Sequence, residues 1–246
     1  MDSLSLNPLC AVATLHRKGS DLLAFGLPKI DESFPGVQRG HLTALVGHRV
    51  CRAFSFLLGV RCQLPIRKGG MNCRAIYVDG GNTFDPYRVS AIAQKHRLEP
   101  RCVLEKILIS RAFTSYQLTA VIFEKLEEAL KKYRSKLVII ADAMGLFLDK
   151  DLPVTEGRDV FMKMTEYLSE LAATRRIIIV VTCSRQRDLG RSIFLRSVLF
   201  GRANTVIGFR KSRGVLRFAV ERHPSLMSLV VDLPSNLVTM DRFVEA

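Results

Sequence analysis

Residues 74–96 read RAIYVDGGNTFDPYRVSAIAQKH, an apolar strand, a glycine-containing loop and a helix in succession. The run Arg74–Asp79 is apolar without alternation, which is typical of a parallel strand covered on both faces. Pro86 opens the helical segment Tyr87–His96, because proline fits the first turn of a helix. This strand–loop–helix unit predicts a sheet with helices packed against it.

The same pattern recurs on both sides of this unit. Two long segments, Ser115–Arg134 and Arg158–Thr174, have the apolar spacing of helices, the second with Thr155 as its expected cap. We therefore predict an α/β fold, a mostly parallel sheet with helices on both faces. Its core strands are His41–Val46, Arg74–Asp79, Lys106–Ser110, Lys136–Ala141 and Arg176–Cys183.

The pattern changes after Cys183. Residues 203–209, 215–221 and 228–231 are short apolar runs, and the first two flank a turn at 211–214. They predict antiparallel strands added to the edge of the sheet, with a hairpin at the turn. We expect residues 1–40 to form an irregular segment packed on the core, and residues 41–246 to form the core domain.

Composition excludes several classes of protein. Hydrophobic residues make up 48% of the chain and charged residues 24%, which excludes extensive disorder. There is no apolar run of the roughly 18 residues that a membrane span needs, and no signal-peptide pattern at the amino terminus. The six cysteines lack the spacing of zinc ligands, so we expect no metal. These features predict a soluble, cytoplasmic protein without a membrane partner.

The net charge of +14 is unevenly placed. Between residues 185 and 222 there are ten basic residues and two acidic ones, so this stretch supplies +8 of the total. A clustered excess of this kind favours binding to polyanions such as nucleic acid.

The loop after the first core strand is where an open α/β sheet commonly binds a nucleotide. It reads GHRVCRAF from Gly47. A phosphate-binding loop has Gly, four residues, then Gly-Lys-Ser/Thr, because backbone amides, an ammonium group and a hydroxyl must meet the phosphates and magnesium. Here Ala53 stands for the lysine and Phe54 for the hydroxyl residue. A slip of one residue would place Arg52 at the lysine position, and an ordinary strand–helix turn is the other interpretation.

Two further segments, Tyr77–Leu98 and Ile109–Leu118, resemble the core of the RadA/RecA recombinase family. The first carries Asp79, Thr83, Phe84, Pro86 and Arg88 of the family pattern Y-I-D-T-E-G-T-F-R-P-E-R. The second carries Arg111, Ala112, Phe113 and Gln117 of the pattern A-R-A-F-N-x-x-H-Q. The resemblance covers residues 29–232 and implies a RecA-like three-layer sandwich with an antiparallel C-terminal extension.

The departures from the family imply a degenerate nucleotide site. The family's catalytic glutamate aligns with Gly81, which has no side chain to polarise water. Asp142 aligns with the aspartate that supports magnesium in the family, although it could equally cap a buried strand. We therefore expect no catalytic residue, no cofactor and a pseudo-ATPase, with ATP binding left open at a vestigial site made of Gly47, Arg49, Arg52 and Asp142.

The resemblance also locates a nucleic-acid site, because the segment that corresponds to residues 184–202 faces DNA in the family. Arginines here could pair with phosphates while Phe194 and Phe200 stack on unpaired bases. The alternative is that residues 193–199 form a small helix packed on the core. The candidate DNA-binding residues are Arg185, Arg187, Arg191, Arg196, Arg202, Arg210, Lys211 and Arg213.

Residues 1–40 contain neither the family's helix–hairpin–helix domain nor its Phe-x-x-Ala tether. We therefore expect a core-only paralogue that binds single-stranded DNA, a recombinase or another paralogue, as an oligomer or hetero-complex and an accessory factor in recombination and repair. The alternatives are a divergent ATPase, using Arg52 and a glutamate from a neighbouring subunit, and a structural scaffold. The sequence does not fix the host lineage, and an archaeal or bacterial source is the working expectation.

Overall fold

A computed structural model of the chain describes residues 21–47, 49–183, 190–212 and 214–233. Its centre is an eight-stranded sheet in the order β10-β9-β8-β3-β7-β6-β4-β5. Among the described residues no helix has the length and apolar character of a membrane span. The strands of this sheet are β3 (Leu42–Val46), β4 (Ala75–Asp79), β5 (Ile107–Arg111), β6 (Leu137–Ala141), β7 (Ile178–Cys183), β8 (Thr205–Ser212), β9 (Val215–Arg222) and β10 (Leu229–Leu233).

The five predicted core strands are confirmed as β3 to β7, with bounds shifted by two residues or fewer. All five run parallel, and β6 lies in the middle of the sheet between β4 and β7. Every residue of β3, β4, β6 and β7 is buried, which is why their sequences show no alternation.

The prediction for residues 203–209 was partly wrong. This segment belongs to β8, which pairs with β9 antiparallel as predicted but with β3 in parallel, and β10 pairs with β9 antiparallel. The reason is the helix α9 (Gly190–Arg202). It returns the chain to the edge of the sheet where the parallel strands begin, so β8 starts there and runs in the same direction as β3. The predicted hairpin is confirmed: Ser212 pairs with Val215, and Gly214 takes a φ of 80° in the turn.

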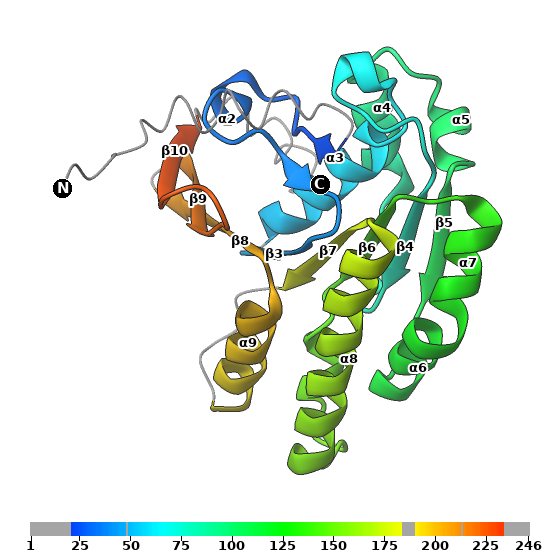
Figure 1. The fold of residues 1–246 in the computed structure, drawn as a ribbon, viewed down its shortest axis with the longest axis vertical. Coiled ribbons are helices and arrows are strands. Elements are labelled where there is room, and N and C mark those ends of the chain that lie inside the picture. The colour runs from blue at the N-terminus through cyan, green and yellow to red at the C-terminus, as the bar shows by residue number, and fades with distance from the viewer. Residues whose placement is uncertain (1–20, 48, 184–189, 213, 234–246) are drawn as a thin grey trace.

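Helices cover both faces of the sheet (Figure 1). One face packs against α3 (Arg49–Arg61), α4 (Pro86–Lys95) and α5 (Pro100–Leu104). The other packs against α6 (Ser115–Ala120), α7 (Leu126–Tyr133), α8 (Val154–Arg175) and α9. A π-helical turn, Val121–Lys125, joins α6 to α7, so the predicted helix over 115–134 is one continuous segment. Short 3-10 turns lie at Ile66–Lys68 and Gly145–Leu148.

Local sequence explains where the helices begin, although one predicted helix cap was wrong. Asp85 caps α4 by accepting hydrogen bonds from the N–H groups of Tyr87 and Arg88 at 3.0 and 3.2 Å. Thr155 does not cap α8, because that helix begins at Val154 with Pro153 in the capping position. Proline is tolerated at this position because its fixed φ is compatible with the start of a helix.

Residues 21–40 lie against the α3 face of the sheet. They form the short strands β1 (Leu22–Leu23) and β2 (Val37–Gln38) and the single helical turn α2 (Pro28–Asp31). Phe25, Ile30 and Phe34 are fully buried in the same cluster as the core residues of α3. The remainder of the predicted N-terminal segment, residues 1–20, lies outside the described part of the chain.

Candidate functional site

The junction between β3 and α3 is the place where a nucleotide's phosphates would bind. β3 ends at Val46 and α3 begins at Arg49, so the residues that align with most of a phosphate-binding loop are helical. A phosphate cradle needs several non-helical residues whose N–H groups converge on the anion. Among the described residues, Gly47 is the only one between β3 and α3.

Gly47 has a structural reason to be glycine. A Cβ at this position would lie 2.9 Å from both the Cβ and the carbonyl oxygen of Phe209 on β8. The absence of a side chain therefore lets β3 and β8 lie side by side at this point. The close approach of two strands accounts for this glycine without a bound phosphate.

The residues in the lysine and hydroxyl positions belong to the hydrophobic core. Ala53 and Phe54 are 5% and 2% exposed. The ring of Phe54 lies 4.4 Å from that of Phe209 and 5.3 Å from that of Phe25, centroid to centroid. These side chains point into the packing between α3, β8 and the N-terminal segment, where no charged ligand could reach them.

Arg52, which a one-residue slip would put in the lysine position, is half-buried on α3. Its charge lies close enough to lower the pKa of Tyr77, although burial dominates and raises that pKa overall. Arg49 begins α3, and its side chain is outside the described structure. The structure therefore places these two arginines on the same helix.

Asp79 is buried and fully engaged by the loop that follows it. Its two carboxylate oxygens each accept a hydrogen bond from the N–H of Thr83 at 2.9 Å, and one also accepts from the N–H of Phe84 at 2.8 Å. Such charge-assisted bonds fix the course of the loop. The role of Asp79, which the sequence identified only as a match to the family pattern, is therefore to hold this loop in place.

Asp142 follows β6 in a left-handed conformation, with φ of 50°. Its N–H donates to the Thr182 hydroxyl at 3.0 Å. A Cβ on Gly81 would lie 3.0 Å from the Cβ of Asp142, and one on Gly145 would lie 2.9 Å from its carboxylate oxygen. The side chain of Asp142 thus lies against two glycines, so a glutamate at position 81 would have to displace it.

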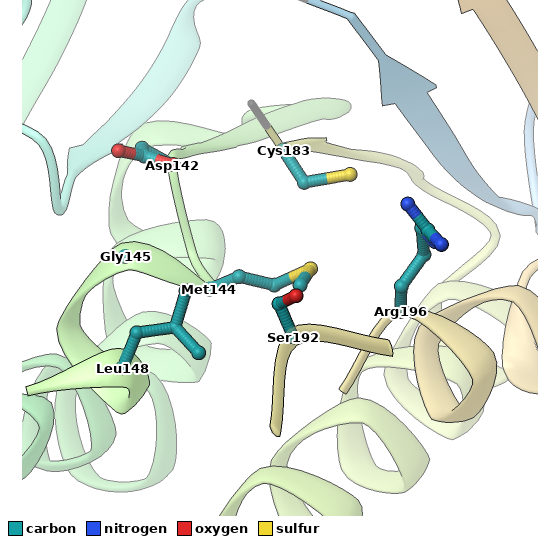
Figure 2. Close-up of a pocket in the computed structure, with 7 residues that line it drawn as sticks. All are labelled: Asp142, Met144, Gly145, Leu148, Cys183, Ser192 and Arg196. Carbon is teal, nitrogen blue, oxygen red and sulfur yellow. The ribbon is translucent and has the colours of Figure 1, made fainter. Parts of the chain in front are cut away.

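The space beside Asp142 is small. Figure 2 shows Asp142 on one side of it and Cys183 and Arg196 on the other, with Ser192 below. Its volume is about 10 Å³, room for about one water molecule. Burial raises the pKa of the Cys183 thiol far above its ordinary value, which keeps this sulfur protonated. A protonated, buried thiol of this kind is not a reactive nucleophile.

The predicted DNA-facing segment is a helix over its described part. α9 begins at Gly190, and Ser192, Leu195 and Leu199 are buried on the core. The small helix that the sequence offered for residues 193–199 is therefore present and extends over residues 190–202. The apolar residues 193–195, 198 and 199 gave only a weak signal for it, because basic residues dominate the stretch.

Three of the predicted DNA-binding arginines lie on α9 among intramolecular neighbours. Arg191 donates from one nitrogen to the backbone carbonyls of Asp149 and Leu152, at 3.0 and 3.1 Å. Arg202 forms an ion pair with Glu166 at 3.0 Å. Arg196 faces the small space beside Asp142. These contacts join α9 to α8 and to the loop before it.

The two phenylalanines expected to stack on bases are occupied. The guanidinium of Arg158 lies 4.5 Å above the ring of Phe194, and both Phe194 and Phe200 pack against the hydrophobic cluster of this face. Both rings are partly exposed, so part of each is covered by the protein's own side chains.

Arg210 and Lys211 are exposed near the end of β8. β8 is parallel to β3 and continues past it, since Val46 pairs with Gly208 and β8 ends at Ser212. These two residues therefore lie at the carboxyl edge of the parallel strands, the edge that the β7–α9 connection also leaves. Arg185, Arg187 and Arg213 lie outside the described residues.

Comparisons with known proteins agree with this architecture. A model of the Rad51 family matches residues 23–220. The chain is 34% identical over 139 residues to the DNA repair protein Rad51 homolog of Drosophila melanogaster, covering 54% of this chain and 41% of that protein. It is 28% identical over 145 residues to the DNA repair protein RAD51 of Saccharomyces cerevisiae strain S288c, covering 55% of this chain and 35% of that protein.

The chain thus spans less than half the length of these two curated relatives. Both relatives are eukaryotic, so they give no support to an archaeal or bacterial source. The parallel sheet with its antiparallel extension is the fold that the resemblance implied, and the family model covers most of the residues that build it. This chain belongs to the Rad51 family.

Proposed function

We propose that this chain is a non-hydrolysing Rad51-family paralogue, which acts in recombination and DNA repair by binding single-stranded DNA and a recombinase or another paralogue. The observation that carries the proposal is the burial of Ala53 and Phe54 in α3, a helix that begins at Arg49, three residues after β3 ends at Val46. These positions hold the lysine and the hydroxyl residue in an active phosphate-binding loop.

The chemistry of phosphoryl transfer supports this interpretation. The reaction depends on positioning and on neutralising charge with an ammonium group and magnesium. Here the ammonium and hydroxyl positions are apolar, Gly81 offers no base, and the space beside Asp142 takes about one water. Each difference alone would slow hydrolysis, and together they leave no group to carry it.

The carboxyl edge of the strands supports the DNA-binding part of the proposal. Arg210 is exposed there, and the sequence places Arg185 and Arg187 in the connection that leaves the same edge. Because Phe194 and Phe200 are packed on the core, we expect contacts to phosphates without base stacking. Binding should then be salt-dependent and insensitive to base sequence.

The nucleotide proposal is tested by measuring ATP turnover of the purified chain, with and without oligothymidine. We expect no measurable turnover and no rise in melting temperature on adding Mg·ATP. A rate of about 1 per second or more, abolished by Asp142→Ala, would favour the divergent ATPase instead.

The DNA proposal is tested with Arg187→Ala/Arg210→Ala and with a control of equal charge, Lys29→Ala/Arg67→Ala, whose residues are exposed elsewhere. For labelled oligothymidine, the slope of log affinity against log salt should flatten by roughly 1.4 in the first variant, about 0.7 for each lost phosphate contact. It should stay unchanged in the control. An unchanged slope in both variants would favour the scaffold function.

A further inference from the structure

A row of cations lies at the opposite, amino-terminal edge of the parallel strands. Lys136, Arg74 and Lys106 immediately precede β6, β4 and β5, which are adjacent in the sheet. Ala75 pairs with both Ile107 and Leu137, so the three cations lie at the same level. Neighbouring strands are about 4.8 Å apart, which makes this a row about 10 Å long.

The backbone fixes this row. The N–H of Ala75 donates to the carbonyl of Lys106 at 3.1 Å, and the Ser135 hydroxyl donates to the carbonyl of Arg74 at 2.8 Å. The positions of the three residues therefore follow from strand pairing and not from a loose loop. β4 and β6 are buried on both faces, and β5 pairs with β4 along its full length, which sets the register.

The end of α7 adds two more cations to the same edge. Lys132 is in its last turn and Arg134 follows it, both exposed, directly before the residues that lead into β6. We define the amino-edge patch as Arg74, Lys106, Lys132, Arg134 and Lys136. Within the described parts of the chain none of these five lies within 4.0 Å of a carboxylate oxygen, whereas the neighbouring Arg39 and Arg176 share Asp21.

The chemistry of the patch selects its ligand. Tyr133 contributes an aromatic ring here, but it is half-buried with Arg74 and Lys132 above it, at 5.9 and 5.5 Å from the ring centroid. Proteins that hold single strands usually offer open aromatic faces to unpaired bases. A surface of cations without such faces suits a ligand whose bases are already stacked and whose phosphates face outward.

We propose that the amino-edge patch binds the phosphate backbone of duplex DNA. The proposal rests on the proposed function for its choice of DNA as the polyanion, but not on the site at the carboxyl edge. β4 is five residues long, which separates the two edges by about 16 Å of strand, so the two sites do not overlap. The chain would then hold a duplex and a single strand at opposite ends of one sheet.

The test measures fluorescence anisotropy of a labelled mixed-sequence duplex at several salt concentrations. In Arg74→Gln/Lys106→Gln/Lys136→Gln the slope of log affinity against log salt should flatten by roughly 2.7, about 0.9 for each phosphate contact. The control Lys29→Gln/Arg67→Gln/Lys163→Gln removes the same charge from exposed residues elsewhere and should keep the wild-type slope. Lys106→Gln alone, at an exposed side chain, should flatten the slope by about 0.9 without changing the melting temperature.

Binding of oligothymidine, a single strand, distinguishes the duplex-binding proposal from the single-strand proposal made above. The amino-edge triple variant should bind oligothymidine like the wild type, while Arg210→Ala should weaken oligothymidine binding and leave duplex binding intact. Patch-dependent duplex binding without any oligothymidine binding would support this inference and contradict the single-strand proposal. Absence of duplex binding in the wild type, an unchanged slope in the folded Lys106→Gln variant, or equal losses in the patch and control triples would each overturn it.

Discussion

Gly47→Ala distinguishes a packing glycine from a phosphate-loop glycine. The added methyl group would lie 2.9 Å from two atoms of Phe209, closer than Cβ atoms normally approach any neighbour. One of these atoms is a backbone carbonyl oxygen in β8, which pairs with β3 on one side and β9 on the other. Relief of the clash therefore requires movement of a paired strand and not rotation of a side chain.

Overpacking of this kind costs about 1–3 kcal/mol of the free energy of unfolding. Since about 1 kcal/mol shifts the melting temperature of a chain this long by roughly 2–4 °C, we expect a drop of about 2–12 °C. Circular dichroism melts with and without Mg·ATP provide the measurement. The matched control is Gly201→Ala near the end of α9, where an added Cβ meets nothing within 4 Å and the melting temperature should hold or rise slightly.

The opposite pattern would refute this reasoning. If Gly47→Ala melts like the wild type but abolishes a stabilisation by Mg·ATP that the wild type shows, Gly47 serves a phosphate and the nucleotide site is functional. If it melts like the wild type in both conditions, β8 tolerates the methyl group and the packing explanation fails.

Three further predictions concern residues with defined partners. Arg191→Met should lower the free energy of unfolding by about 1–3 kcal/mol, because two bonds to backbone carbonyls are lost, while the salt slope for oligothymidine stays that of the wild type. Asp79→Asn should also lower the free energy of unfolding by about 1–3 kcal/mol, about the value of a buried charge-assisted bond. The reason is that the new amide places an N–H donor opposite the N–H groups of the loop, and urea titration measures the loss. His223 should make the fold acid-sensitive: burial lowers its pKa from 6.5 to about 4, so the unfolded chain takes up the proton first and stability falls as pH drops from 6.5 to 4. His223→Gln should remove much of that pH dependence in melts at pH 7 and pH 5, which a melt with an unchanged pH dependence would contradict.

The sequence was sufficient for the parallel core. Unbroken apolar runs such as residues 137–141 favour burial on both faces, which is typical of parallel strands covered by helices. The turn at Gly214 was equally readable, because its positive φ suits glycine. That Ala53 and Phe54 carry neither an ammonium nor a hydroxyl group is also a property of the sequence, since no fold can add a functional group to a side chain.

The direction of β8 and the surroundings of the charged residues depended on tertiary structure. A short helix over residues 190–202 reverses the chain, and its apolar face is too brief to stand out among five basic residues of the 185–202 stretch. The sequence does not show whether an arginine will bind a phosphate or a backbone carbonyl of the same chain. Arg191, for example, donates to the carbonyl of Leu152, which is 39 residues away in sequence. Only the register of β4, β5 and β6 brings Arg74, Lys106 and Lys136 into one row, because residues 30 or more positions apart meet through strand pairing that local sequence does not encode.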